Sequence, residues 1–395
     1  MKNLETLINE LCPQGVEFVK LGDCCNFRRG TTITAKNAIP GDVPVLAGGQ
    51  KPAYYHNKAN RTGETIVVAG SGAYAGYVSY WNIPVFLSDS FSVEPDERLS
   101  IKFVYYFLKN IQQRIFSTKK GSGVPHVHGS SIAKFEIPLP PIEVQTEIVR
   151  ILDKFTSLEA ELEAELDCRK RQYEYYRDKL LSFENVGGQE VEWKKMSEVI
   201  YSINTGLNPR RFFRLNTIDA HNYYVTIKEM KNGNIVFNDD TDMINDDALK
   251  LCNNRSHLEK GDLIFSGTGT IGQIVVLKET PTNWNIKEGL YSLKPIKEKI
   301  DSKYMAYILN ETSIRKTYMK KALGGTVKSV PMKVLTNIKI PIPPLAEQER
   351  IVSILDRFES LTTSLTAGLP AEIAARRQQY EHYRDQLLTF KRKSA

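Results

Sequence analysis

The chain has 395 residues, of which 41% are hydrophobic and 25% charged, and its formal net charge is +7. This composition is typical of globular proteins and leaves room for two domains, while the lack of a long apolar run argues against a membrane span or a signal peptide. Five cysteines without a CxxC pair argue against a disulfide framework or a thiolate zinc site, so we expect a cytoplasmic protein.

The sequence contains the same boundary between a proline-rich segment and a helix twice. A proline-rich segment at 137–141 leads into a helical pattern, and a matching segment at 340–344 leads into a second one. Each helical pattern closes on a block of the form QYExYRDxLL, at 172–181 and at 379–388. A period of about 200 residues is too long for a solenoid and predicts a duplicated module, a globular domain followed by a long helix.

The elements expected before each boundary follow the same order. The first repeat has a short helix over 1–14, β-rich runs at 16–21, 43–46, 65–68 and 76–81, and a helix over 101–116. The second has β-rich runs at 191–196, 223–227, 262–265 and 272–277, and a helix over 302–321. Val16 follows the N-terminal helix as Val191 follows the first long helix, so we expect the N-terminal helix to pack beside the end of the chain.

The long helices carry a narrow apolar stripe, with hydrophobic residues every three or four positions over 148–180. About 40 residues rising 1.5 Å each would form a rod of roughly 60 Å, too long to be buried in one domain. We therefore expect the two helices to pair as an antiparallel coiled coil. Ala367-Gly368-Leu369-Pro370 falls within the second helix, which predicts that the helices are unequal or broken.

The predicted fold is α+β, with two similar α/β domains in a pseudo-two-fold internal repeat. The domains are expected at 1–140 and 186–343, and the long helices at 141–185 and 344–395. Residues 1–140 and 184–343 carry net charges of +4 and +5, and the helical segments 141–183 and 344–395 carry −3 and +1. This distribution favours a polyanion as the partner of the domains and protein as the partner of the helices.

The candidate catalytic motifs are weak. Residues 267–272 match GxGxxG, but a strand-like run follows them, which predicts a glycine-rich hairpin and argues against a dinucleotide site. His126 and His128 lie on one face of an extended segment, and a metal site there is less favoured than a polar or DNA contact because no acidic or thiol partner stands at ligand spacing. The pattern indicates a chain without catalytic residues of its own.

Basic, small polar and aromatic residues gather in the loops of both domains, where arginine can contact guanine or phosphate and glycine allows close backbone approach. Solvated surface charge is the alternative for any one of them. The candidate DNA-binding residues are Arg28, Arg29, Thr31, Thr32, Ser71, Tyr74, Lys119, Lys120, His126, His128, Arg210, Arg211, Arg214, Thr268, Lys320, Lys321 and Lys328.

Taken together, the doubled boundary, the closing blocks and the tetrads Leu158-Glu159-Ala160-Glu161 and Leu162-Glu163-Ala164-Glu165 resemble the specificity subunit of type I restriction-modification systems. The resemblance covers essentially the whole chain. It implies two target-recognition domains, each reading one half of an asymmetric bipartite site in double-stranded DNA, with spacer helices that set the gap.

The resemblance also implies partners. Two methyltransferase subunits would dock on the helices and restriction/translocase subunits would join later, so S-adenosylmethionine, ATP and magnesium would belong to those subunits and not to this chain. The implied partner-binding residues are Gln145, Tyr173, Tyr176, Arg177, Gln348, Tyr380, Tyr383 and Arg384. Two alternatives are a coiled-coil scaffold with two protein-binding heads and a stand-alone nucleotide-dependent enzyme.

Overall fold

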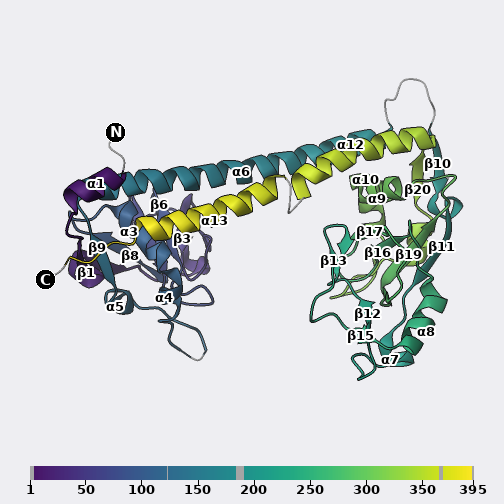
Figure 1. The fold of residues 1–395 in the computed structure, drawn as a ribbon, viewed down its shortest axis with the longest axis horizontal. Coiled ribbons are helices and arrows are strands. Elements are labelled where there is room, and N and C mark those ends of the chain that lie inside the picture. The colour runs from purple at the N-terminus through teal and green to yellow at the C-terminus, as the bar shows by residue number, and fades with distance from the viewer. Residues whose placement is uncertain (1–3, 122, 184–190, 364–367, 394–395) are drawn as a thin grey trace. The chain divides into compact units, whose positions relative to one another are not determined.

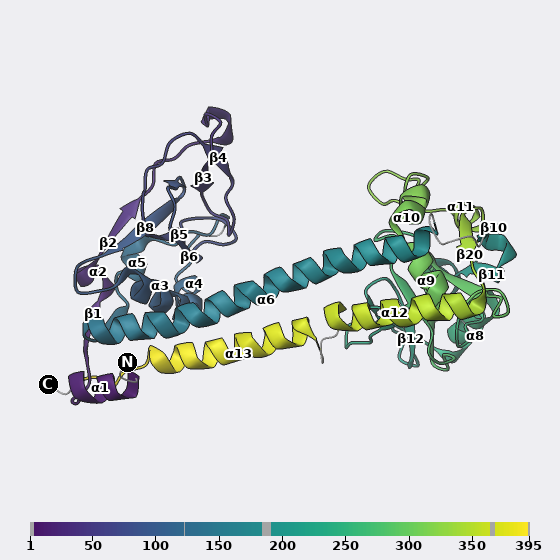
Figure 2. The same ribbon diagram turned by 90° about the horizontal axis from the view of Figure 1, so that it is seen from above.

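A computed structural model describes residues 4–121, 123–183, 191–363 and 368–393 (Figures 1 and 2). Its contacts divide the chain into two compact units, residues 1–163 with 373–395, and residues 164–372. Each unit contains one globular domain together with the parts of the long helices that pack on it. The predicted boundaries separate domains from helices, whereas the contacts group each domain with its own helix ends.

The domain of the first unit is built on a four-stranded antiparallel sheet. Its strand order is β2 (Cys25–Arg29), β8 (Ser90–Pro95), β5 (Thr65–Ala69) and β6 (Val78–Trp81). Smaller sheets join β4 (Tyr54–His56), β3 (Val43–Leu46) and β7 (Phe86–Leu87), and also β1 (Glu17–Lys20) and β9 (Glu136–Leu139). Its short helices are α2 (Leu21–Cys24), η1 (Ala35–Asn37), α3 (Ile101–Asn110), α4 (Gln112–Phe116) and α5 (Gly129–Ile132).

The domain of the second unit repeats this plan. Its four-stranded sheet has the order β11 (Ile200–Thr205), β19 (Leu290–Pro295), β16 (Leu263–Ser266) and β17 (Ile274–Val276). Smaller sheets are β15 (Met243–Ile244), β12 (Asn222–Val225) and β18 (Trp284–Ile286), then β10 (Glu192–Lys195) and β20 (Lys339–Ile342), and β13 (Met230–Lys231) and β14 (Asn234–Ile235). Its helical segments are η2 (Met196–Glu198), α7 (Pro209–Phe212), α8 (Asp246–Ser256), α9 (Ser302–Asn310), α10 (Thr312–Met319) and α11 (Met332–Thr336).

Each domain helix expected after the sheet is two helices. In the first domain the chain leaves helical geometry at Ile111, with φ −93° and ψ 18°, between α3 and α4. In the second, Glu311 ends α9 and caps α10, because its carboxylate accepts hydrogen bonds from the backbone N–H groups of Ser313 and Ile314. The apolar face continues across both breaks, and so the sequence pattern did not show them.

Buried side chains from the sheet and from its covering helix form the core of each domain. In the first domain all five residues of β5 are buried, and Phe103 and Leu108 of α3 have no exposed area. In the second, Phe265 of β16 and Tyr304 of α9 are likewise fully buried. Each core extends to the start of a long helix, through Ile148 and Leu152 in one unit and Ile351 and Leu355 in the other.

The two long helices are antiparallel and unequal, as predicted. α6 (Ile142–Ser182) is continuous over 41 residues, whereas its counterpart consists of α12 (Leu345–Thr363) and α13 (Leu369–Leu387), each of 19 residues. In the first unit Phe155 stacks on Tyr383, and Glu159 pairs with Arg377. Residue numbers therefore rise along α6 as they fall along α13, which defines the antiparallel sense.

The N-terminal helix packs beside the end of the chain, as predicted. α1 (Leu4–Leu11) places Leu4 in the same core as Leu388. Val16 donates its N–H to the carbonyl of Lys391 at 2.9 Å and accepts from the N–H of Lys393 at 2.9 Å, which forms a parallel bridge with Arg392. The first domain is thus completed by the last residues of the chain.

Candidate nucleic-acid interface

The glycine-rich turns of the two domains are held by the same backbone hydrogen bonds. In the first domain Val127 donates to the carbonyl of Gly70 and Gly72 donates to that of Pro125, each at 2.9 Å. In the second, Val330 donates to Gly267 at 2.8 Å and Gly269 donates to Lys328 at 2.9 Å. Each turn is therefore tied to a loop that follows the covering helices.

The GxGxxG segment is a hairpin, as the sequence predicts. It connects β16 to β17, two antiparallel neighbours, and no helix N-terminus follows it to receive a phosphate. Gly269 and Gly272 take φ +78° and +88°, the left-handed region that glycine adopts without strain. The turn therefore shapes a loop, and nothing in its geometry provides a dinucleotide site.

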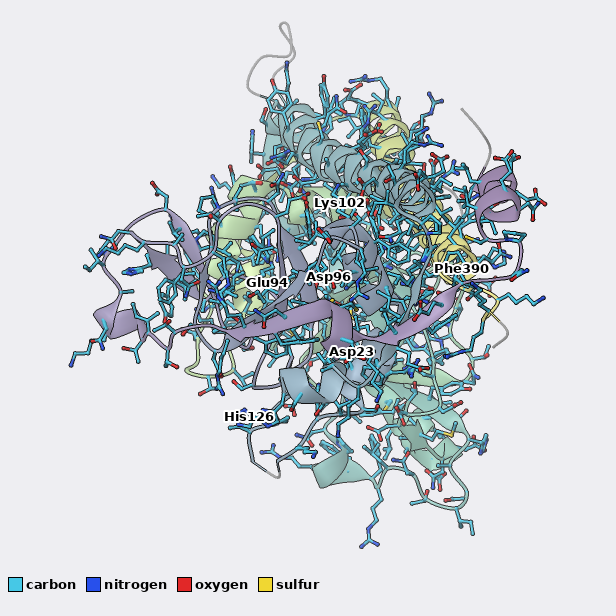
Figure 3. All side chains as sticks on the ribbon, turned by 90° about the vertical axis from the view of Figure 1, so that its left-hand side faces the viewer. Asp23, Glu94, Asp96, Lys102, His126 and Phe390 are labelled. Atoms are coloured by element: carbon cyan, nitrogen blue, oxygen red, sulfur yellow. The ribbon has the colours of Figure 1, made fainter. Side chains whose placement is uncertain are left out.

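Charged side chains surround the turn of the first domain. Arg29 Nη2 lies 3.6 Å from Asp89 Oδ1, and the other carboxylate oxygen accepts a hydrogen bond from the Ser71 hydroxyl. The imidazoles of His126 and His128 are nearly parallel, with ring centroids 6.4 Å apart. A pocket of about 220 Å³ is lined by Arg29, Asp89, both histidines and Ser130 among others. His126 lies on the side of the domain away from Lys102, which contacts α6 (Figure 3).

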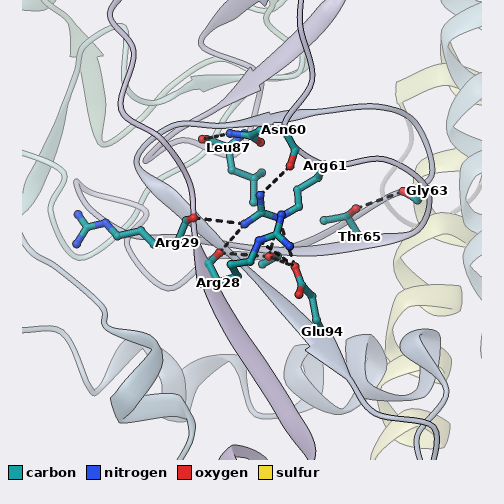
Figure 4. A network of polar contacts seen from close by, with 9 residues as sticks. Arg28, Arg29, Asn60, Arg61, Gly63, Thr65, Leu87 and Glu94 are labelled. Atoms are coloured by element: carbon teal, nitrogen blue, oxygen red, sulfur yellow. Dashed lines mark hydrogen bonds and ion pairs between the residues drawn. The ribbon is translucent and has the colours of Figure 1, made fainter.

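The end of β2, which carries Arg28 and Arg29, is held by hydrogen bonds from the buried side chain of Arg61 (Figure 4). The Arg61 side chain is 8% exposed and donates from Nη2 to the carbonyls of Arg28 and Arg29, at 2.9 and 3.3 Å. Its Nε donates to Ser92 Oγ at 2.9 Å and lies 3.4 Å from Glu94 Oε1. Burial lowers the pKa of this guanidinium, which remains charged at neutral pH because the unperturbed value is so high. Arg61 therefore orients its neighbours and is itself out of reach of DNA.

The equivalent turn of the second domain is surrounded by hydroxyl groups. Thr268 Oγ1 lies 3.0 Å from Ser329 Oγ. Thr205 Oγ1 accepts from the N–H of Gly289 at 3.1 Å and donates to the carbonyl of Leu290 at 3.2 Å. The two domains thus present different side chains on the same backbone arrangement.

The other predicted DNA-binding residues are mostly exposed and scattered. Lys119 is half-buried and donates to the carbonyl of Ala73 at 3.1 Å, next to the exposed Tyr74. The exposed residues of this group are Thr31, Thr32, Lys120, Arg211, Arg214, Lys320, Lys321 and Lys328. Arg210 lies in α7, and its side chain falls outside the described part of the structure.

The lysine pairs Lys119-Lys120 and Lys320-Lys321 precede the glycine turns of the two domains at different distances. Lys119 and Lys120 come directly before Gly121, whereas Lys320 and Lys321 directly follow α10 and stand two residues further from Gly324. In the matching hydrogen-bonded pairs Lys120 corresponds to Leu323. The lysines of the two domains therefore occupy neighbouring and not equivalent positions.

Residues that the sequence did not single out complete the site. Asp89 and Arg61 organise the first domain's loops, and Thr205 and Ser329 organise those of the second. The alignment of the two repeats gave a signal for Ser329, which stands where the first repeat has His126. Asp89 gave none, because an acidic residue is not a marker of contact with a polyanion.

Gln145 and Gln348 do not form a partner surface, which corrects the expectation. Both have no exposed area. The Gln145 amide donates to the carbonyls of Arg98 and Pro140 and accepts from the N–H of Ser100. Gln348 makes the same three bonds, to Lys299, Pro343 and Asp301. A buried amide with its hydrogen bonds satisfied within the chain fixes the start of a long helix against its own domain.

Most residues of the closing blocks also bond within the chain. Arg384 donates to Asn110 Oδ1 at 3.0 Å, and Arg177 lies 3.3 Å from Thr312 Oγ1. Tyr173 and Tyr380 are half-buried, and burial raises the pKa of both phenol groups. The more exposed members are Tyr176, 38% exposed and stacked on Phe358, and Tyr383, 40% exposed and stacked on Phe155.

Neither histidine belongs to a metal-binding group. Across residues 4–121, 123–183, 191–363 and 368–393, no cluster of three or more His, Cys, Asp or Glu side chains could hold a metal ion. In the same part of the chain no helix combines the length and apolar character needed to cross a membrane.

Comparison with known proteins places the fold and the repeat in context. Residues 13–167 and 189–375 match the family described as type I restriction modification DNA specificity domain. The specificity subunit of the type I restriction enzyme EcoR124I/EcoR124II of Escherichia coli is 30% identical over 99% of this chain and 97% of its own length. A putative type I specificity subunit of Haemophilus influenzae is 30% identical over 99% of this chain and all of its own.

Solved structures share the fold at lower identity. The specificity subunit of the type I restriction-modification system of M. genitalium has a TM-score of 0.58, with 18% identity, and the match covers 95% of this chain and 96% of that one. A chain from a study of complex assembly and conformational transition of the type I system has a TM-score of 0.59, with 18% identity over 95% of this chain and 98% of that one.

Proposed function

Because this chain belongs to the family of type I restriction-modification DNA specificity subunits, we propose that its two domains each recognise one half of a bipartite, asymmetric DNA site. One observation carries the proposal: the two glycine-rich turns have the same hydrogen-bonded backbone and display different side chains, charged in one domain and hydroxyl-bearing in the other. A common scaffold with exchanged contact groups is what two readers of different base sequences require.

The chemistry of the system belongs to partner subunits. The chain would direct two methyltransferase subunits, and later the restriction/translocase subunits, to the site, while those subunits bind S-adenosylmethionine, ATP and magnesium. The names of the curated relatives, which are specificity subunits, support this division. The cytoplasm is the compartment where such a complex meets DNA.

The long helices would set the gap between the half-sites and provide the docking surface. α6 is continuous through residues that belong to both units, so its length and twist are transmitted along one helix. Tyr176 and Tyr383 occupy equivalent, partly exposed positions on stacked aromatic pairs, one in each unit. Two equivalent surfaces suit two identical subunits.

The first test is to supply the chain with its methyltransferase and map the methylated sites by sequencing. We expect one bipartite motif, and binding of its duplex that weakens with added salt. The chain alone should neither methylate nor cleave DNA. A protein-binding scaffold would show no salt-dependent affinity for DNA, and turnover by a preparation free of partners would contradict the assignment of chemistry to the other subunits.

The second test lengthens α6. Duplicating Leu162-Glu163-Ala164-Glu165 after residue 165 leaves the Arg377 contacts to Glu159 and Glu163 in place. Four residues add about 6 Å of helix and about 400° of rotation, a net turn near 40°, which approximates one base-pair step. We expect both half-site sequences to survive and the unread gap to lengthen by about one base pair. An unchanged gap with full activity would show that α6 does not set it.

A further inference from the structure

Five positions around the glycine-rich turn are structurally equivalent in the two domains. Arg29 and Thr205 stand opposite Phe91 and Tyr291 in their sheets. The first residue after β5 or β16, Gly70 or Gly267, donates to the carbonyl of Asp89 in one domain and to that of Gly289 in the other. The five pairs, which we term the turn cluster, are Arg29 and Thr205, Ser71 and Thr268, Asp89 and Gly289, His126 and Ser329, and His128 and Pro331.

The side chains of the turn cluster differ between the two domains, although the backbone hydrogen bonds around it are the same. The first domain places a guanidinium, a carboxylate and two imidazoles there, whereas the second has hydroxyls, glycine and proline and no charge. Since the shared hydrogen bonds hold both turns without these side chains, the fold does not demand the charged set. A difference that the scaffold does not require points to specificity.

We propose that Arg29 and Asp89 read one G·C base pair of the half-site recognised by the first domain. This inference rests on the function proposed above, namely that this face meets DNA. Arginine offers two parallel donors that fit O6 and N7 of guanine, and a carboxylate accepts from N4 of the paired cytosine. Arg29 and Asp89 lie 3.6 Å apart, so both can reach the two bases of one pair.

The groups around Arg29 and Asp89 favour contacts with bases over contacts with phosphate. A carboxylate next to phosphate would repel the polyanion, and so Asp89 argues for a contact with donor groups of the bases. The Ser71 hydroxyl holds one oxygen of Asp89, and each carboxylate oxygen has capacity for a further hydrogen bond. The Arg29 side chain is 72% exposed while its backbone is fixed by Arg61, which leaves the guanidinium free to reach outward from a rigid base.

The proposal is tested on the site mapped for the wild-type complex. Arg29→Ala and Asp89→Asn should each relax one G·C position of one half-site by about 5- to 150-fold and leave the other half-site unaltered. Asp89→Asn retains an acceptor for Ser71, and thermal unfolding shows whether the fold is kept. Arg171→Ala is the matched control, because that side chain is 73% exposed and lies on α6 beside Asp167.

Modified duplexes identify the atoms. Replacing the guanine at the relaxed position by 7-deazaguanine removes N7 and should weaken the wild-type complex, while the Arg29→Ala complex should lose little more. Likewise, N4-methylcytosine in the paired strand should weaken the wild-type complex, while the Asp89→Asn complex should lose little more.

Failure of the proposed function and failure of the G·C assignment give different results. If the wild-type complex shows no half-site, the proposed function fails. If it does and both variants keep every position, or both weaken all sequences evenly with a flatter salt dependence, the G·C assignment alone is overturned.

Discussion

The two recognition domains use an ion pair at the same place with the charges exchanged. In the first, Glu94 of β8 lies 3.4 Å from the buried Arg61, which precedes β5. In the second, Lys294 occupies the matching position of β19 and lies 3.0 Å from Asp262, just before β16, and 2.8 Å from Glu259. Each domain thus has an ion pair between this strand and the segment that leads into the neighbouring strand, β5 or β16, and the two ion pairs have opposite polarity. Two domains of one fold can therefore keep their strand pairing while the charges that join a strand to a neighbouring loop change sign.

The largest expected effect comes from replacing one domain. Exchanging residues 191–336 for the matching part of another family member should replace one half-site completely, because that segment holds the sheet and loops of the second domain. The first domain draws its core from residues outside this segment, so its half-site should remain. Methylation mapping checks both halves, and a change in both, or in neither, would show that the domains do not act independently.

A second experiment asks whether the domains are attached in the same way. Gln145→Ala and Gln348→Ala each remove three hydrogen bonds of a buried amide, and we expect each to lower the free energy of unfolding by about 2–4 kcal/mol. Gln113→Ala, on an exposed position of α4, is the control. Urea unfolding measures the losses. A large loss for one glutamine only would mean that one helix junction is secured by other contacts.

The exchanged ion pair predicts a dependence on pH in the second domain. Burial raises the pKa of Asp262, so its ionisation costs stability as the pH rises through its folded pKa. Lys294 offsets that cost. In Lys294→Met the carboxylate loses its ammonium partner, and the stability lost relative to wild type should grow to about 1–3 kcal/mol between about pH 4 and pH 7. Denaturant unfolding across that range measures it. A loss independent of pH would show that Lys294 contributes by packing.

The smallest effect is expected from a single exposed lysine. Lys320→Ala should weaken binding to all sequences evenly and flatten the salt slope by about one unit, because we expect the exposed ammonium that follows α10 to neutralise phosphate. Fluorescence anisotropy at several salt concentrations, with specific and unrelated duplexes, measures both quantities. A loss confined to the specific duplex would instead place Lys320 among the base contacts.

The sequence predicted the features that repeat and missed those that depend on side-chain direction. The doubled boundary and the antiparallel helices followed from comparing the two copies. Gln145 and Gln348 were expected at a partner surface because the resemblance implied it, and only the fold shows that both amides are buried against backbone carbonyls. The partnership of Arg29 with Asp89 could not be predicted, since strands β2 and β8 that bring them together lie 60 residues apart.

The bridge between Val16 and residues 391–393 has a consequence for how the protein is made. The second unit is one continuous stretch of chain, whereas the first needs both the beginning and the last 23 residues, 373–395. During synthesis the second domain can fold as soon as it leaves the ribosome, but the first must wait for the final helix and its tail. A chain released before the segment that carries Leu388 has been made would therefore have an N-terminal domain that, although made first, lacks part of its core.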